Sequence, residues 1–188
     1  LTIHRLVFVL LVAVSFSIGK TAIAGAEYNE IEWTQLMPAD DLAALLNPPD
    51  FLLDIEDGED NDNIESLSTL SESNETAKRF AQALQSTRVI DAFDQARIRL
   101  PGFIVPLQSD EQQRVTHFFI VPYFGACLHM PPPPPNQIIY AEFQSGVQLN
   151  TLLDPYWFEG TLQIAHTVNG LGSSAYTLRL DAYSPYED

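Results

Sequence analysis

Apolar side chains at helical spacing predict two short helices in the first half of the chain. Leucines recur every three or four residues over Asp40–Leu46, with Pro38 just before this run and two prolines just after it. A second helix is expected to begin after the capping residue Asn74 and to run to about Ser86. Its apolar residues share one face: Ala77, Phe80, Ala81 and Leu84.

From Val89 onward the apolar pattern changes to the alternation that is typical of strands. Gly102 and Gly160 stand inside two of these segments, where a glycine often marks a sharp bend. Six strands are expected, over residues 89–93, 98–107, 116–121, 137–143, 156–165 and 175–183. The pattern therefore predicts a mainly β, α+β protein: a small, partly open β-barrel of the OB type, with one or two N-terminal helices packed outside it.

The first residues have the pattern of a cleavable signal peptide. The apolar run Leu6–Ile18 is too short to span a bilayer but suits the apolar region of a leader, and small residues provide cleavage sites before Gly25 or Glu27. Residues 1–26 are therefore expected to be removed on export from the cytoplasm. No later apolar run has the length of a transmembrane helix, so no stable membrane insertion is expected after cleavage.

Acidic residues crowd the segment that follows the first predicted helix. Residues 54–73 contain many Asp and Glu residues and no Lys or Arg, which is typical of a flexible linker. The mature chain is thus expected to have an N-terminal helical segment at 27–53, an acidic linker at 54–73, and a helix plus β-barrel domain at 74–188.

Charge and cysteine content narrow the classes of function. The chain has 25 acidic and 9 basic side chains, a net charge of -16, so it lacks the positive surface that nucleic acids require. The same charge would repel anionic lipid surfaces. A single cysteine, Cys127, excludes an intramolecular disulfide, so the core must be stable without one.

Cys127 and His129 are the candidate metal ligands. In an extended segment, residues two apart point to the same side, so the thiolate and the imidazole could share one ion. Both groups are good ligands for Zn(II), and a zinc site usually needs three or four ligands. Further ligands could come from a partner or from three other side chains of this chain: His117, His166 and Asp154.

Five consecutive prolines follow this pair and prevent both helix and regular strand there. Three interpretations remain open: a structural crossover, a metal or thiol site stiffened by the prolines, and an interaction or scaffold module that uses the proline-rich loop and in which Cys127 is structural. No familiar catalytic motif accompanies Cys127, so we expect the protein not to be an enzyme. The residues expected to shape the loop or to contact a partner are Gly125, Pro131, Pro132, Pro133, Pro134 and Pro135.

Two stretches resemble a bacterial family of exported proteins of unknown function. They are Leu100–Leu107 and the run from Gly125 to Gln137, which has the form G-A-C-x-H-x-P-P-P-P-P-N-Q. The resemblance extends over about Arg88–Tyr183. It implies a periplasmic accessory protein, because relatives often occur beside components of ABC-type transport systems, some of them connected with zinc uptake. It also implies an envelope partner such as an ABC transporter component, with Cys127 and His129 as the site and with Asn136 and Gln137 as loop-shaping or interacting residues.

Overall fold

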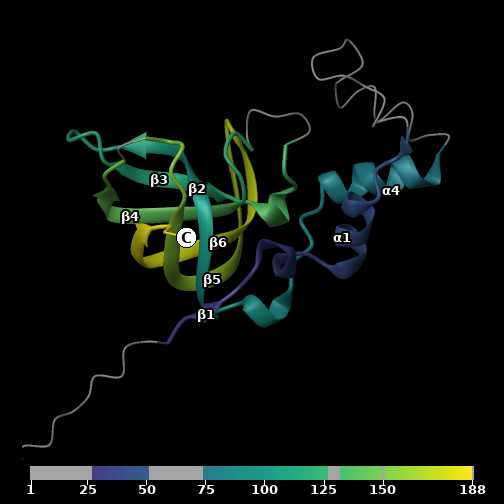
Figure 1. The fold of residues 1–188 in the computed structure, drawn as a ribbon, viewed down its shortest axis with the longest axis horizontal. Coiled ribbons are helices and arrows are strands. Elements are labelled where there is room, and N and C mark those ends of the chain that lie inside the picture. Colours follow the sequence, from purple (N-terminus) through teal and green to yellow (C-terminus); the bar gives the residue numbers. More distant parts are fainter. Residues whose placement is uncertain (1–26, 51–73, 127–131, 150, 188) are drawn as a thin grey trace, which may run out of the picture.

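The computed structural model describes residues 27–50, 74–126, 132–149 and 151–187 (Figure 1). The predicted signal peptide, the predicted acidic linker, and Cys127, His129 and Pro131 lie outside the described residues. A β-barrel occupies one side of the molecule in Figure 1, and two helices lie together on the other side.

The elements follow one another in the order β1 (Asn29–Glu30), η1 (Trp33–Leu36), α1 (Ala39–Leu46), α4 (Glu75–Leu84), η2 (Asp91–Phe93), β2 (Arg97–Ser109), β3 (Val115–Val121), η3 (Pro135–Gln137), β4 (Ile139–Val147), β5 (Tyr156–Asn169) and β6 (Gly172–Pro185). Both predicted helices are present. Pro38 precedes α1, and the Asn74 side chain caps α4 by accepting hydrogen bonds from the backbone N–H groups of Thr76 and Ala77. None of the helices in the described part of the chain has the length and apolar character to cross a membrane.

The strands form a closed five-stranded barrel with β1 as an additional short strand. The strand order is β1-β2-β3-β4-β6-β5, and pairing between β2 and β5 closes the barrel. Only β4–β6 and β1–β2 pair in parallel; the other neighbours are antiparallel. This is the five-stranded Greek-key architecture of the OB type, so the predicted barrel is confirmed and is closed rather than partly open.

Two glycines stand where the barrel bends, as the sequence predicts. At Gly102, strand β2 changes its neighbour from β5 to β3, and a Cβ there would lie 2.7 Å from Cγ2 of Ile120. At Gly160, the register between β5 and β6 shifts, and a Cβ would collide with the carbonyl oxygen of Arg179. Close approach of the backbone therefore requires glycine at both corners.

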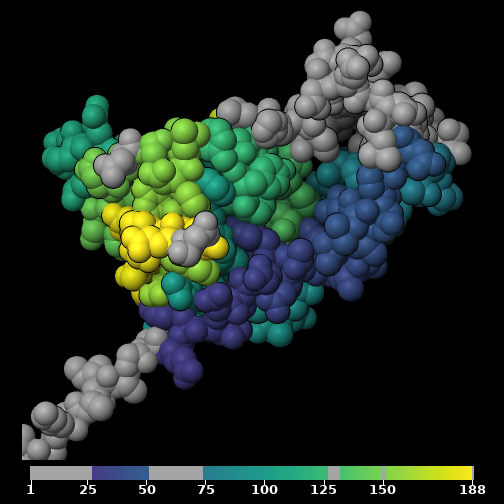
Figure 2. Space-filling model, viewed as in Figure 1, coloured from purple at the N-terminus to yellow at the C-terminus, as the bar shows by residue number. Residues whose placement is uncertain are grey.

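The N-terminal segment closes one end of the barrel core. Ile31, Trp33 and Leu36 are buried together with the apolar side chains that fill the barrel. The Trp33 indole N–H donates to the Pro101 carbonyl at 2.7 Å, and the Tyr176 hydroxyl donates to the Leu36 carbonyl at 2.9 Å. Figure 2 shows the purple N-terminal segment between the yellow-green part of the barrel and the blue helix α1.

One predicted strand is wrong. Residues 91–93 form the short 3-10 helix η2 instead of part of a strand at 89–93, and the sixth strand is β1. The backbone N–H of Ile90 donates to the Tyr176 hydroxyl at 2.8 Å, and Phe93 N–H donates to the Ile90 carbonyl. Val89 and Phe93 still pack against the core. Their apolar side chains therefore cover part of the barrel although the residues do not form a strand.

A buried aspartate ties the two helices together. Asp41 on α1 is only 1% exposed, and its carboxylate accepts hydrogen bonds from Arg79 on α4, from Arg88 at 3.2 Å and from the Ser86 hydroxyl at 2.6 Å. Asp40 accepts from the same two arginines. Hydrogen bonding to the Arg88 guanidinium lowers the pKa of Asp40 from its usual range. This ionic cluster holds α1 against α4 although the two helices are far apart in the sequence.

Candidate functional site

A second apolar cluster lies outside the barrel, on strand β3 and its neighbours β2 and β4 and on the connection between β3 and β4. Side chains alternate along β3, so Phe118 and Ile120 fill the barrel whereas Phe119 and Val121 point outward. The outward residues are nevertheless buried. We call Phe119, Val121, Ala126 and Ile138 the outer cluster; half-buried residues pack around it, namely Phe103, Val105, Leu107 and Tyr140.

The outer cluster is where the connection between β3 and β4 is attached. Ala126, the residue before Cys127, is fully buried in this cluster. On the other side of the gap in the described chain, Pro133 and Pro134 are buried, and Ile138 rejoins the cluster just before β4. Gly125 has a φ of 76°, a value that glycine adopts easily. Both described ends of the connection are therefore packed against the barrel, while Cys127 and His129 lie in the undescribed stretch between them.

Asn136 and Gln137 fix the end of this connection from inside the protein. The Asn136 amide donates to the Arg88 carbonyl at 2.9 Å, and the Gln137 amide donates to the Trp33 carbonyl at 2.8 Å. Both side chains are buried, and Asn136 Oδ1 has no hydrogen-bond partner among the described atoms. These contacts join the connection to two distant segments of the chain.

Burial of the prolines bears on how the loop could be used. Pro133 and Pro134 are buried, and Pro132 and Pro135 are half-buried. A groove that binds polyproline needs exposed rings. The four described prolines thus present little surface for such docking.

His117 is the candidate ligand that lies nearest to the outer cluster. A register shift on both sides of β3 turns Thr116 and His117 outward together. His117 Nε2 lies 2.8 Å from Glu142 Oε1, and its Nδ1 lies 3.0 Å from Thr116 Oγ1. Its ring also contacts Tyr140, with 6.4 Å between ring centroids. His117 therefore belongs to the same outward surface as Ala126, and Glu142 orients its ring.

The other two candidate ligands lie elsewhere. Asp154 is exposed in the loop before β5, and His166 is exposed toward the far end of that long strand. Asp154 precedes the first residue of β5, whereas His166 lies ten residues into the strand, beyond the bend at Gly160. In the described part of the chain, no three His, Cys, Asp or Glu side chains gather closely enough to hold a metal ion.

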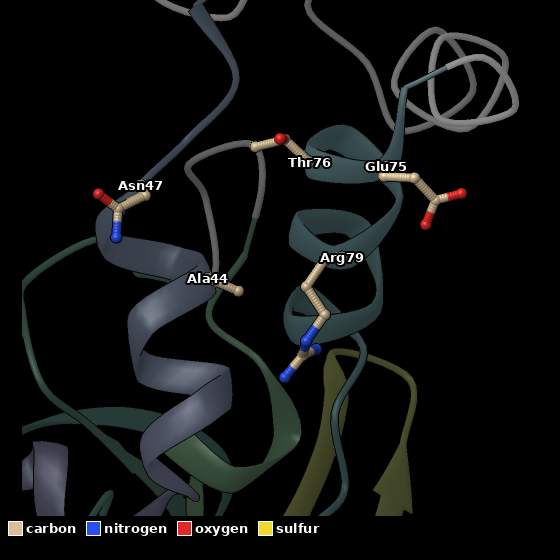
Figure 3. Close-up of a pocket in the computed structure, with 5 residues that line it drawn as sticks. All are labelled: Ala44, Asn47, Glu75, Thr76 and Arg79. Carbon is tan, nitrogen blue, oxygen red and sulfur yellow. The ribbon is translucent and has the colours of Figure 1, made fainter.

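A hollow of about 300 Å³ lies between the ends of helices α1 and α4 (Figure 3). Five residues line it: Ala44, Asn47, Glu75, Thr76 and Arg79. The Arg79 guanidinium already binds Asp40 and Asp41, and Glu75 points away from α1 in Figure 3. Because its single cation is already paired with two carboxylates, this open hollow offers no free positive charge to a ligand.

Sequence reasoning missed the outer cluster and the contact between His117 and Glu142. The continuous apolar run Phe118–Val121 was the available signal, because a strand buried on both faces loses its alternation. Glu142 carries no such signal, since only the β3–β4 register places it opposite His117.

Comparisons with known proteins give one family and one solved structure. A family model described as "Protein of unknown function (DUF3299)" matches residues 33–185. The chain is similar to a DUF3299 family protein from Pseudomonas aeruginosa PAO1, whose crystal structure was determined at 2.45 Å resolution. The two sequences are 34% identical and the structures superpose with a TM-score of 0.61. The match covers 87% of this chain and 99% of that chain. No curated protein matches the chain.

Proposed function

The chain belongs to the DUF3299 family of proteins of unknown function, and from this starting point we propose that it is an exported accessory protein of the cell envelope that binds Zn(II) through Cys127 and His129. In this proposal the protein is periplasmic, it binds metal without turning over a substrate, and its partner is a component of an ABC-type transport system.

The observation that carries the proposal is the attachment of both ends of the Cys127 segment. Ala126 is buried in the outer cluster on one side, and Pro133 and Pro134 are buried on the other. A segment held at both ends loses less conformational entropy when it binds an ion. A thiolate and an imidazole within such a segment form a suitable pair of zinc ligands.

His117 is the best of the three further ligands. Its Nε2 contacts Glu142, and a carboxylate on one ring nitrogen orients a metal-binding histidine and makes it more basic. Its Nδ1, which contacts the Thr116 hydroxyl in the structure, would bind the metal in place of that hydroxyl. Three protein ligands would leave a fourth position for a water or for a group from the partner.

The charge of the protein supports a role with cations. A net charge of -16 raises the concentration of cations near the surface and keeps an exported protein soluble. No familiar catalytic motif occurs in the sequence, and a metal carrier needs none.

Titration calorimetry with Zn(II) on the chain from residue 27 onward tests this proposal. We expect one site, which Cys127→Ser and His129→Ala weaken by more than the tenfold to about hundredfold loss that is typical of removing a supporting contact. His166→Ala is the matched control, because His166 is exposed at the far end of β5 and should leave zinc binding unchanged. Circular dichroism of each variant checks folding.

Equal zinc binding by the wild type and Cys127→Ser, or no binding by either, would contradict the proposal. The protein would then be better described as an interaction module in which Cys127 is structural.

A further inference from the structure

The hairpin formed by β5 and β6 extends beyond the closed part of the barrel. Strand β2 pairs with β5 only as far as Thr161, and Leu162 makes the last backbone bonds on that side, with Gln95 and Ala96. Beyond Ile164, the residues Thr167, Val168 and Asn169 pair with β6 alone among the described residues, and Ala165 and His166 form a bulge before them. The yellow-green end of this hairpin rises above the barrel in Figure 1. Within the described part of the chain, one edge of β5 is therefore open.

Backbone groups at this edge face solvent. Asn169 and Gly172 lie opposite each other across a two-residue turn, and such a closing pair exchanges its hydrogen bonds. Because backbone groups alternate between the two edges of a strand, the N–H and carbonyl of Val168 point to the open edge. An open edge of this kind is a template for another strand.

Apart from the bulge at Ala165 and His166, the edge has none of the charged or proline residues that usually prevent such pairing. No Asp, Glu, Lys, Arg or Pro occurs between Glu159 and Arg179, although the chain as a whole is highly charged. Val168 is 70% exposed and Leu171 is 61% exposed. A hairpin end without Asp, Glu, Lys or Arg and with exposed apolar side chains, on a protein of net charge -16, is a surface suited to contact.

We propose that the open edge of β5, residues 165–169, binds an extended segment of a partner protein as an additional antiparallel strand. This inference is independent of zinc binding.

The surroundings of the edge indicate the chemistry of the partner segment. Asp94 Oδ1 accepts the backbone N–H of Ile164 at 3.0 Å and so lies at the base of the edge, and Asp91 lies in the same short helix η2. An added strand antiparallel to β5 would run from the hairpin tip toward Asp94. Its branched apolar residues would cover Val168, and a lysine or arginine near its C-terminal end would meet these carboxylates. A second copy of this chain suits the edge less well, because each copy carries a charge of -16.

Fluorescence anisotropy with a labelled peptide, Ser-Val-Thr-Val-Ser-Val-Lys-Lys, tests the inference on the chain from residue 27 onward. Val168→Pro removes the edge N–H and should weaken binding by about tenfold or more. Val168→Thr keeps the N–H and should bind like the wild type. The same peptide with N-methylated valines should not bind, because it lacks the donors that pair with the edge.

Two further variants keep the test decisive. If Val168→Pro does not fold, Val168→Lys places a charge on the edge and should weaken binding, whereas Leu46→Lys, at a helix position of similar exposure, should not. Asp94→Asn keeps the acceptor but removes the charge, so it should weaken binding of the lysine-containing peptide more than Glu111→Gln does.

Three results would overturn the inference. They are no binding of the peptide to the wild type, equal binding by the wild type and the edge variants, and a dimer in sedimentation velocity that Val168→Pro converts to a monomer. The last would show that a second copy occupies the edge.

Discussion

Replacing Phe119 by leucine should separate the stability of the barrel from the geometry of the proposed zinc site. Phe119 is fully buried outside the barrel, where it packs with Ala126 and meets the Tyr140 ring edge-on at 6.3 Å between centroids. Leucine is smaller than phenylalanine, and a small reduction of a buried side chain costs about 0.5–1.5 kcal/mol. Loss of the aromatic pair adds about 0.5–1.5 kcal/mol. The expected decrease in unfolding free energy is therefore about 2 kcal/mol.

Phe158→Leu is the matched control. Phe158 is also fully buried, but it lies inside the barrel, where it contacts the rings of Phe118 and Tyr156. Urea denaturation should give a similar loss of stability for both variants. Zinc affinity should fall about tenfold in Phe119→Leu, because the attachment next to Cys127 loosens, and should stay within about twofold in Phe158→Leu. Equal zinc affinity in the two variants would refute the idea that the outer cluster positions the site.

Two further predictions concern the fold. Gly160→Ala should lower the unfolding free energy by about 2 kcal/mol or more, because its Cβ would collide with a backbone carbonyl, whereas Gly170→Ala, which meets open space, should be tolerated; urea denaturation compares them. The lowered pKa of Asp40 beside Arg88 means that its carboxylate stabilises the folded protein above about pH 4 and that this contribution is lost as the pH falls through the lower folded-state value. The urea midpoint should therefore decrease more between pH 6 and about pH 2 in the wild type than in Asp40→Asn, and parallel decreases would contradict this.

Periodicity and glycine positions were sufficient to predict the barrel. Alternation located most of the strands, and Gly102 and Gly160 were identified as corners because a strand interior rarely tolerates glycine without such a reason. Closure of the barrel depends on pairing between β2 and β5, which are far apart in the sequence. No local pattern encodes that contact.

The N-terminal half shows why other features could not be predicted. Strand β1 has only two residues, too few to show an alternation. The acidic pair at the start of α1 is a common feature that favours any helix N-terminus, so nothing marked Asp41 as buried. Its role depends on Arg79 and Arg88, which the fold brings to it from the other side of the predicted linker.

That Cys127 and His129 bind a metal stays a prediction, which rests on their spacing in the sequence. Asn136 and Gln137 were singled out through the family resemblance, and the structure shows what their side chains bind. His117 was one of three equal candidates in the sequence. The register shift in β3 and the contact with Glu142 distinguish it, and both are properties of the assembled sheet.

Diffraction from crystals of the chain from residue 27 onward grown with Zn(II), with data collected on both sides of the zinc absorption edge, tests the central claim most directly. The account predicts an anomalous peak bound by Cys127 Sγ at about 2.3 Å and by a ring nitrogen of His129 at about 2.0–2.1 Å. A zinc ion bound elsewhere, or a Cys127 thiol buried away from His129 with no peak beside it, would contradict the claim.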